Sequence, residues 1–473
     1  MTRWQDRALT IPFDSFTKGL GVVMKLRFVS HASFSVESGG ITLLTDPWLF
    51  GKAFNQGWAL LSPAAIVPWE KIDYVWISHQ HPDHLHFPTL KSLPPQEKNR
   101  LTMLYQKHAS QRIPKVLRGM GYPNVQEVTL NKWISLRGGV EVMCGSAGSM
   151  DSWIAVRAEG VNVLNLNDCM IEPAYLAYIS TLVGKVTVLL TQFSFANWIG
   201  NRADELGEAE TKLREVRQRV NLLKPEATIP FASFIYFCSQ ENSWMNEFSI
   251  TPRRVADLGL PGINFMYPGD EWDSDVRTFS SAEAIERYMN DVARPKVIDP
   301  TPAAISVDVI QQAVDRTLRA VRARFGKFAI GRIKPFSIYL HDLDKVLSVY
   351  PAGTCKVHDA TEDRRDAARY IMCSQVAWYA FAYSWGWGAM EVSGMYSDRR
   401  FKESNPLVFY LNILSTEFLN FGSVRQAGRT VEFLWAKRRE LCYRMLARFI
   451  RRKESDVAAA CRRGASIAAD RAA

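Results

Sequence analysis

The chain has 473 residues, of which 47% are hydrophobic and 22% charged, as is typical of a globular protein with two or three domains. Its 28 Gly and 22 Pro are close to average usage, which excludes collagen-like and low-complexity classes. The formal net charge is +10, and an excess of this sign raises the question of a nucleic acid or an anionic membrane as partner.

The positive charge is concentrated near the end of the chain. Residues 431–473 contain 11 Lys and Arg against 5 Asp and Glu, in a helical and partly amphipathic pattern without a nucleic-acid-binding motif. We therefore predict no nucleic-acid partner. The basic tail is expected either to touch an acidic partner or an anionic membrane surface, or to present a solvated helix face.

Cysteine usage and the N-terminal sequence predict a cytoplasmic protein. The 7 cysteines are scattered and form no CxxC pair, which favours reduced thiols over a disulfide framework. The N-terminus lacks the apolar region of a signal peptide. Residues 370–390 carry no charge, but they include Ser, Gln and Gly. We interpret them as a buried helix running into a Trp/Gly loop rather than as a membrane span.

Short apolar runs alternate with helical patterns from Leu26 to about Trp272. Early strands pair as hairpins and later strands alternate with helices, which indicates a two-sheet sandwich flanked by helices. Helices are predicted from Glu208 to Leu223 and from Thr251, the N-cap, to Leu258. The predicted strands cover residues 26–30, 41–46, 72–78, 101–106, 140–145, 153–158, 161–167, 185–192, 227–232 and 263–268.

Composition and pattern divide the chain into five segments. A polar, Pro-containing stretch is typical of a linker, and the strong helical pattern after Ser306 indicates a second, mainly helical α+β domain with a strand at 336–340. The expected segments are an N-terminal extension (1–25), the sandwich domain (26–275), the linker (276–304), the second domain (305–430) and the basic helical tail (431–473).

Four potential metal ligands follow the apolar strand that ends at Ser78. They are His79, His81, Asp83 and His84, in an H-x-H-x-D-H spacing. Two imidazoles two positions apart can point into one site, while the next turn directs the other two side chains to a second position. Such a ligand set suits zinc, iron or manganese. The alternative is a surface loop that happens to hold histidines. However, four of the chain's 8 histidines, these three and His86, fall within eight positions.

The motif resembles the signature of the metallo-β-lactamase superfamily, and the likeness extends from about Leu26 to Trp272. SHASF (30–34) and TDPW (45–48) precede it and LNDC (166–169) follows it. Together with MDSWIAV and IPFASF, these segments are most similar to the C-terminal domain of CMP-N-acetylneuraminate hydroxylases, and the first two also to the ascorbate-6-phosphate lactonase branch. The resemblance implies a four-layer αββα fold, two divalent metal ions (zinc or iron) and Asp168 as the carboxylate between them.

The chain departs from the family pattern at two ligand positions. Ala147 stands where one further histidine is expected, and Cys238-Ser239-Gln240-Glu241 where another is expected. Either a carboxylate, Glu241 or Asp151, fills a vacancy, which would favour a harder metal such as iron, or the site is depleted and binds metal weakly or not at all. The expected metal ligands are His79, His81, Asp83, His84, Asp168 and Glu241.

Three residues are candidates for a catalytic role. Asp83 would orient the nucleophile and take or relay its proton. The family resemblance implies that His31 and Asp46 lie near the metals, with the aspartate orienting a ligand histidine. For Asp46 the alternative is a turn acid ahead of Pro47, and for His31 a hydrogen-bonded residue of the core.

The sequence leaves the reaction open. We predict a metal-dependent hydrolase that uses metal-activated water; the alternatives are a non-haem diiron oxygenase and a degenerate fold that acts as a binding module. An oxygenase would need a redox partner, because no C-x-H…C-x-x-H pair is present. The expected substrate is a small molecule with an apolar or acyl part, since the aromatic segment from Tyr370 to Val392 could line a pocket; ordinary core packing is the alternative.

Overall fold

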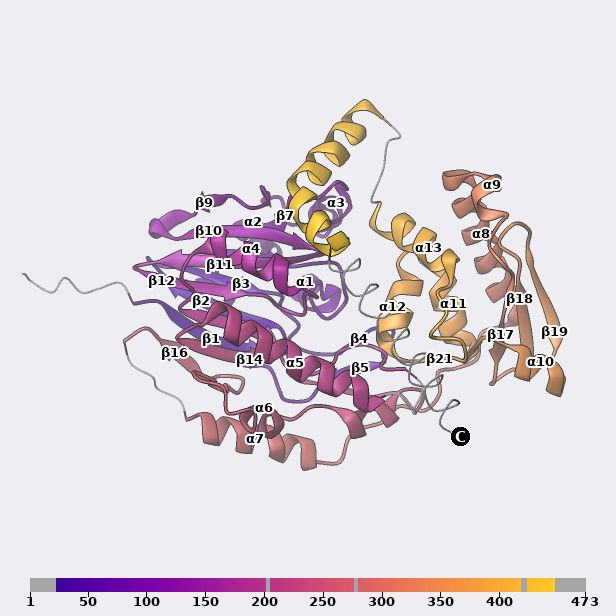
Figure 1. Cartoon of the computed structure of the whole chain (residues 1–473), viewed down its shortest axis with the longest axis horizontal. Helices are drawn as coiled ribbons and strands as arrows, with labels where there is room; N and C mark the ends of the chain where they lie inside the picture. Colours follow the sequence, from indigo (N-terminus) through magenta and orange to yellow (C-terminus); the bar gives the residue numbers. More distant parts are fainter. Residues whose placement is uncertain (1–22, 201–204, 276–279, 418–422, 447–473) are drawn as a thin grey trace, which may run out of the picture.

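Two β-sheets face each other in the computed structural model, which describes residues 23–200, 205–275, 280–417 and 423–446 (Figure 1). One sheet has the strand order β16-β1-β2-β3-β6-β7-β8 and the other the order β14-β13-β12-β11-β10-β9. The strands of the first are β1 (Lys25–Ser30), β2 (Ser33–Ser38), β3 (Ile41–Thr45), β6 (Tyr74–Ile77), β7 (Thr102–Gln106), β8 (Val125–Val128) and β16 (Glu271–Asp273). Those of the second are β9 (Trp133–Ser135), β10 (Glu141–Ala147), β11 (Asp151–Ala158), β12 (Val161–Asn165), β13 (Val188–Gln192) and β14 (Ala227–Phe231).

Apolar side chains from both sheets form one core between them. Phe34 and Trp76 of the first sheet belong to the same buried cluster as Ile154 and Leu190 of the second. Removal of this apolar surface from water is the main force that holds the two sheets together. The resulting layers are those of two sheets packed face to face.

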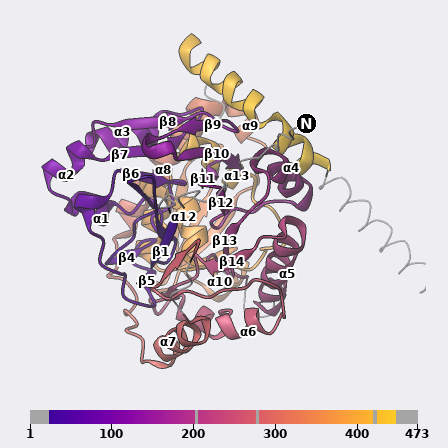
Figure 2. The same ribbon diagram turned by 90° about the vertical axis from the view of Figure 1, so that its left-hand side faces the viewer.

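Helices cover the outer face of each sheet and complete the four layers (Figure 2). Leu90 and Leu117 pack against the outer side of the first sheet, and Leu176 and Ile179 against the outer side of the second. The predicted αββα sandwich is therefore confirmed. Its helices are α1 (Phe87–Ser92), α2 (Pro95–Arg100), α3 (Arg112–Gly119), α4 (Pro173–Val183), α5 (Glu205–Leu223), α6 (Pro252–Ala256) and α7 (Ser281–Ala293).

One predicted strand is wrong. Residues 263–268 form only an isolated bridge from Ile263 to Thr228. The backbone N–H groups of Phe265 and Tyr267 donate to the side chains of Ser281 and Asp270 and not to a neighbouring strand. The apolar run is buried as an irregular segment, which periodicity alone does not distinguish from a strand.

The stretch expected to be a linker contains α7, whose 13 residues pack Ala284 and Tyr288 into the core of the sandwich. Its N-cap Ser280 accepts a hydrogen bond from the backbone N–H of Glu283. A third, three-stranded sheet lies at the edge of the sandwich and consists of β4 (Lys52–Ala53), β5 (Trp58–Leu60) and β15 (Ile235–Phe237).

The C-terminal half builds a second core on a five-stranded sheet and its helices. The predicted helix after Ser306 is α8 (Val307–Phe325), which buries one stripe and ends at Gly326 with φ 85°. The other elements are α9 (Lys327–Ile330), β17 (Phe336–Leu340), β18 (Lys345–Val349), β19 (Cys355–Asp359), α10 (Glu362–Ala367), β20 (Tyr370–Met372), α11 (Ser374–Ala382), α12 (Gly386–Ser393), β21 (Ser397–Asp398) and α13 (Pro406–Thr416).

The uncharged segment 370–390 is divided among a strand and two short helices, β20, α11 and α12. Across the described part of the chain, no helix combines the length and the apolar character that a membrane crossing requires. The last described helix, residues 424–446, runs along the sandwich beside α3 and β9 (yellow in Figures 1 and 2). The rest of the basic tail and the N-terminal extension up to residue 22 lie outside the described residues.

Candidate metal centre

The carboxyl ends of neighbouring strands bring the candidate ligands to one edge of the sandwich. β3 and β6 are adjacent and parallel, so Asp46, which follows β3, meets Ser78 and His79, which follow β6. The backbone N–H of Ser78 donates to Asp46 Oδ1 at 2.8 Å. His31 arrives at the same edge after β1.

The second sheet supplies two carboxylates to this edge. Asp168 follows β12, and Asp151 opens β11 directly opposite Ala147 in the hairpin with β10. Arg219 of α5 holds the Asp168 loop, since its buried guanidinium donates to the carbonyl of Cys169 at 2.8 Å. Both sheets therefore contribute side chains to one site.

Seven side chains form three overlapping groups in which the ligand atoms lie within 4.8 Å of one another. One group contains Asp168 with His79 and His84, and each of these two histidines also belongs to one of the other groups. The groups are His79, His81 and Asp151; His79, His84 and Asp168; and His31, Asp83 and His84.

Two imidazole nitrogens face each other at the most open end of the site. His79 Nε2 lies 2.7 Å from His81 Nδ1, and the Asp168 and Asp151 oxygens lie 3.7 and 4.0 Å from His79 Nε2. Nδ1 of His79 is occupied by Ser78 Oγ at 2.9 Å. Nitrogen lone pairs and carboxylate oxygens that converge in this way are the donor set of a divalent cation.

Several buried polar atoms of the site have no hydrogen bond. His84 Nε2 lies 3.1 Å from Asp83 Oδ2 and 3.5 Å from Asp168 Oδ2, yet makes no hydrogen bond with suitable angles among the described residues. The same holds for Asp83 Oδ1 and Asp168 Oδ1. Buried polar atoms are costly unless they bind a partner, and a cation would satisfy all three. The residues therefore fit a metal centre.

Asp46 fixes the orientation of His84 from behind. Its Oδ2 accepts from His84 Nδ1 at 2.9 Å and from Asn167 Nδ2 at 2.6 Å. A carboxylate that holds Nδ1–H leaves Nε2 free for a metal. Asp46 and Asn167 have positive φ values of 38° and 54°, a strained conformation that these bonds stabilise. The family resemblance implied this role for Asp46, whereas Asn167, in the LNDC segment, was not among the predicted site residues.

The charges of the site perturb its protonation equilibria. Burial lowers the pKa of His79, and burial together with the neighbouring His79 lowers the pKa of His81 to about 4. Burial opposes the charged form of His84, but Asp83 and Asp168 raise its pKa well above the usual value. Burial and repulsion by Asp168 raise the pKa of Asp151 to about 6. These shifts leave neutral imidazoles at the open end, where a metal needs unprotonated ligands.

Of the two carboxylates considered for the vacant histidine positions, the structure brings one to the site. Asp151 lies in the group with His79 and His81. Glu241, expected as a ligand, instead accepts from Thr301 Oγ1 at 2.7 Å and pairs with His341 at 3.0 Å, and it belongs to no ligand group among the described residues. β15 ends before Glu241 and the chain turns toward the C-terminal half, which carries this side chain to His341.

The C-terminal helix 424–446 clamps the turn that leads to Asp151. The buried Glu440 accepts from the backbone N–H of Gly148 at 2.7 Å and from Ser146 Oγ at 3.1 Å. Buried Lys437 pairs with Glu440 at 2.9 Å and donates to the carbonyl of Gly148. This described part of the basic segment is thus a docked helix rather than a freely solvated one.

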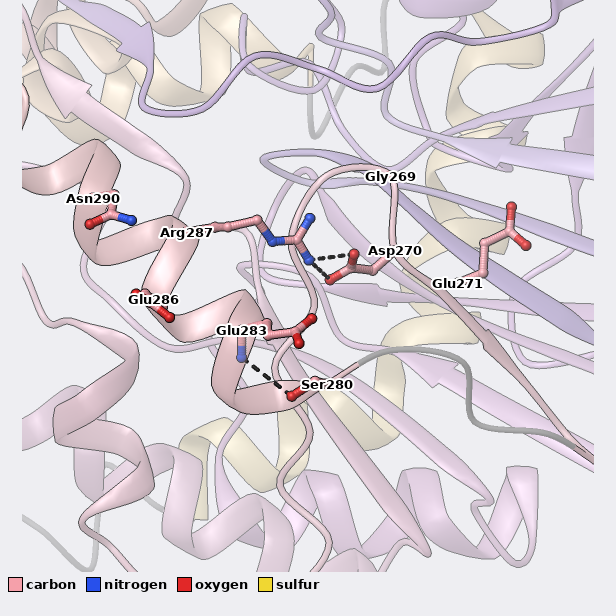
Figure 3. A pocket seen from close by; sticks show the side chains of 8 residues that line it. All are labelled: Gly269, Asp270, Glu271, Ser280, Glu283, Glu286, Arg287 and Asn290. Carbon is pink, nitrogen blue, oxygen red and sulfur yellow. Dashed lines mark hydrogen bonds and ion pairs between the residues drawn. The ribbon is translucent and has the colours of Figure 1, made fainter.

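A surface pocket between α7 and the loop that precedes β16 lies away from the candidate metal ligands (Figure 3). Its volume is about 640 Å³, and none of the seven candidate ligands lines it. The guanidinium of Arg287 is bound by both oxygens of Asp270 at 2.5 and 2.6 Å. The interaction links α7 to the loop that precedes β16.

Residues 25–167 match the family model described as "Beta-lactamase superfamily domain". The chain is 25% identical to the cytidine monophosphate-N-acetylneuraminic acid hydroxylase of Mus musculus over 245 residues, which are 47% of this chain and 41% of the relative. It is 30% identical to that of Danio rerio over 152 residues, 30% of this chain and 25% of the relative. The chain therefore spans less than half the length of these relatives.

Among solved structures, CmlA, a diiron β-hydroxylase from Streptomyces venezuelae, matches with 20% identity over 54% of each chain. The TM-score is 0.37. A value this low adds nothing to the assignment of fold or function.

Proposed function

We propose that the site is a binuclear metal centre and that the protein is a non-haem diiron oxygenase of the hydroxylase type. The match of residues 25–167 to the family model described as "Beta-lactamase superfamily domain" supports a metal centre at this position. The observation that carries the proposal is Asp151, which stands with His79 and His81 where the family pattern has a third histidine. A ligand set with three carboxylates beside four imidazoles is harder than an all-histidine set and favours iron over zinc.

The sequence relatives support the same reaction class, since the matched proteins of mouse and zebrafish are hydroxylases. Insertion of one oxygen atom of O₂ into a C–H bond requires two electrons and two protons and releases one water. When bound, the two irons would supply the one-electron chemistry that activates O₂. The two electrons would have to come from an external reductant, because the described residues of the site include no redox-active group.

The chain's own residues divide this task. His79, His81 and Asp151 would hold one metal, His31, Asp83 and His84 the other, and Asp168 would lie between them. Asp46 holds the ring of His84 in place through Nδ1. Asp151 is partly exposed, so a metal that it holds could be reached from the open end of the site.

The experiment is an oxygen reaction of the full chain loaded anaerobically with Fe(II). We expect about two irons per chain, and O₂ consumption that continues beyond one equivalent per centre only with added reductant. Protein loaded with zinc should consume no O₂. If the iron-loaded protein binds two irons but shows neither O₂ consumption nor a change in its optical spectrum, the oxygenase proposal is wrong and the centre itself stands.

A hydrolase is the second candidate, and the partial exposure of Asp151 and Asp168, at 25% and 21%, favours it because water can reach the ligands. Metal-activated water would then attack the substrate, the role for which Asp83 was predicted to orient the nucleophile. Zinc as the metal retained from cells would support this candidate. Less than a tenth of an equivalent of any metal, unchanged by reconstitution, would favour the third hypothesis, a binding module.

A further inference from the structure

A cavity of about 570 Å³ lies between the sandwich and the aromatic segment of the C-terminal half. This volume is in the range of small-molecule sites. From the sandwich, the loop after β4, the metal-motif loop, α1 and α3 contribute to its wall, and from the C-terminal half α11 and the turn before α12. It is lined by Lys52, Ala53, Phe54, Asn55, Gln80, Pro82, Leu85, His86, Phe87, Pro88, Lys91, Arg112, Ile113, Val116, Tyr379, Tyr383 and Trp385.

The cavity adjoins the metal centre. Gln80 and Pro82 line it and flank the ligand His81 in the chain. The ring of Phe54, another lining residue, lies 5.7 Å from the His81 ring. A molecule in the cavity would therefore sit beside the more open end of the site.

The aromatic segment divides into a buried and an exposed part. Phe381 and Trp387 are packed in the second core, whereas Tyr383 and Trp385 are 38% and 36% exposed and face the cavity. Their rings stack on each other at 5.0 Å. Large aromatic side chains that remain exposed on a concave wall mark a binding surface.

The charge of the wall has one sign. It includes three cationic side chains and no Asp or Glu. Lys52 is paired with Asp299, but neither Lys91 nor Arg112 forms an ion pair among the described residues. Lys91 Nζ lies 5.8 Å from the Phe87 ring, and the Arg112 guanidinium lies 4.8 Å from the Trp385 ring. Arg112 interacts with the Glu417 carboxylate at longer range, without an ion pair. Two cations that form no ion pair beside an apolar wall are complementary to an anion that carries an apolar group.

We propose that this cavity is the substrate site and that it takes a small molecule with a carboxylate or phosphate at one end and an aromatic or acyl group at the other. The anionic end would bind Lys91 and Arg112, and the apolar end would contact Tyr383 and Trp385. Turnover of such a molecule rests on the proposed function. Its binding does not, because none of these four residues is a candidate metal ligand.

The test is isothermal titration calorimetry of the full chain with four probes: 4-phenylbutanoate, phenyl phosphate, 4-phenylbutan-1-ol and acetate. The two aromatic anions should bind at least about tenfold more tightly than the neutral alcohol or acetate. Preference between them identifies a carboxylate or a phosphate as the anionic group. Failure of both to bind at millimolar concentration, or equal affinity for acid and alcohol, would overturn the proposal.

A matched pair of double variants locates the binding site. Lys91→Gln with Arg112→Gln should weaken 4-phenylbutanoate at least about tenfold. Lys98→Gln with Arg118→Gln removes the same charges outside the cavity: Lys98 also lies 5.8 Å from a ring, that of Tyr122, and Arg118 also donates to a backbone carbonyl. Equal weakening by both pairs would overturn the assignment.

Two further results separate the possible failures. Arg112→Lys keeps the positive charge and should restore most of the affinity lost in Arg112→Gln, which a folding defect would not do. Trp385→Ala should weaken both the acids and the alcohol. If the protein binds metal but none of the probes, the substrate-site proposal is wrong and the proposed function stands. If it binds the probes but no metal, the proposed function is wrong and the binding site stands.

Discussion

At the scale of the residue, Asp46 is the side chain that orients the candidate ligand His84. It is buried, accepts hydrogen bonds from three neighbours and sets the direction of His84. Asp46→Asn keeps the volume but places an amide where only acceptors fit. We expect metal affinity to fall about 10- to 100-fold, measured by competition with a chromophoric chelator. Asp73→Asn is the control, because Asp73 also accepts a hydrogen bond from a backbone N–H of β3 but touches no candidate ligand. Its metal affinity should equal that of the natural chain, and an equal loss in both variants would contradict the role of Asp46.

Residue type and spacing were enough to predict His79, His81, Asp83 and His84, and the family resemblance added Asp168. The structure brings these side chains together with His31 and Asp46. They were not enough to decide between Asp151 and Glu241, because both are carboxylates near a vacant position in the chain. Strand register decides: the hairpin places Asp151 opposite Ala147, whereas Glu241 lies beyond β15.

At the scale of the element, the C-terminal helix 424–446 depends on a buried ion pair. Removing one partner of such a pair leaves an uncompensated charge, so Glu440→Gln should lower the free energy of unfolding by about 3 kcal/mol. Glu432→Gln on the same helix breaks only the exposed pair with Lys107 and should cost less than about 1 kcal/mol. Urea unfolding measures both. Equal effects would show that the Glu440 contacts do not stabilise the docked helix.

The turn beneath this helix should make the protein sensitive to acid. His108 accepts from the N–H of Ser110 at Nδ1 and donates to the carbonyl of Ser149, and burial lowers its pKa to about 4. Since the unfolded chain takes up this proton near pH 6.5, the stability that neutral His108 provides is complete above that pH and is lost between 6.5 and 4.

The lowered pKa of His108 therefore reduces the free energy of unfolding by about 2 kcal/mol at pH 5 relative to pH 7. His108→Gln should reduce the difference between the unfolding free energies at pH 7 and pH 5 by that amount. Urea titrations at the two pH values measure it. The same difference in the variant and the natural chain would exclude His108 as its source.

The sequence pattern predicted most strands and helices, because the apolar periodicity that defines them is local. It did not predict the docking of helix 424–446: Lys437 and Glu440 resemble any solvated pair in the sequence, and only tertiary contact with Gly148 buries them. The sequence pattern also did not predict α7 within the expected linker, because its polar residues outnumber the few, such as Tyr288, that reach the core.

At the scale of the whole molecule, the C-terminal half completes the site of the sandwich. Asn55 and Gln375 exchange two hydrogen bonds at 2.8 and 2.9 Å, and Arg112 donates to the carbonyl of Ser415. These contacts join the two cores around the aromatic cavity. Two-sheet layering followed from the sequence, but the placement of Tyr383 and Trp385 beside the metal motif did not, because residues so distant in the chain meet only in the folded protein.

The central claim is a two-metal centre in which Asp151 replaces a histidine. Its most direct test is the anaerobic Fe(II) stoichiometry of the natural chain, Asp151→Asn and Glu241→Gln, measured by equilibrium dialysis. We predict about two irons per chain for the natural protein and for Glu241→Gln, and about one for Asp151→Asn. Two irons retained in Asp151→Asn, or one lost in Glu241→Gln, would contradict the account.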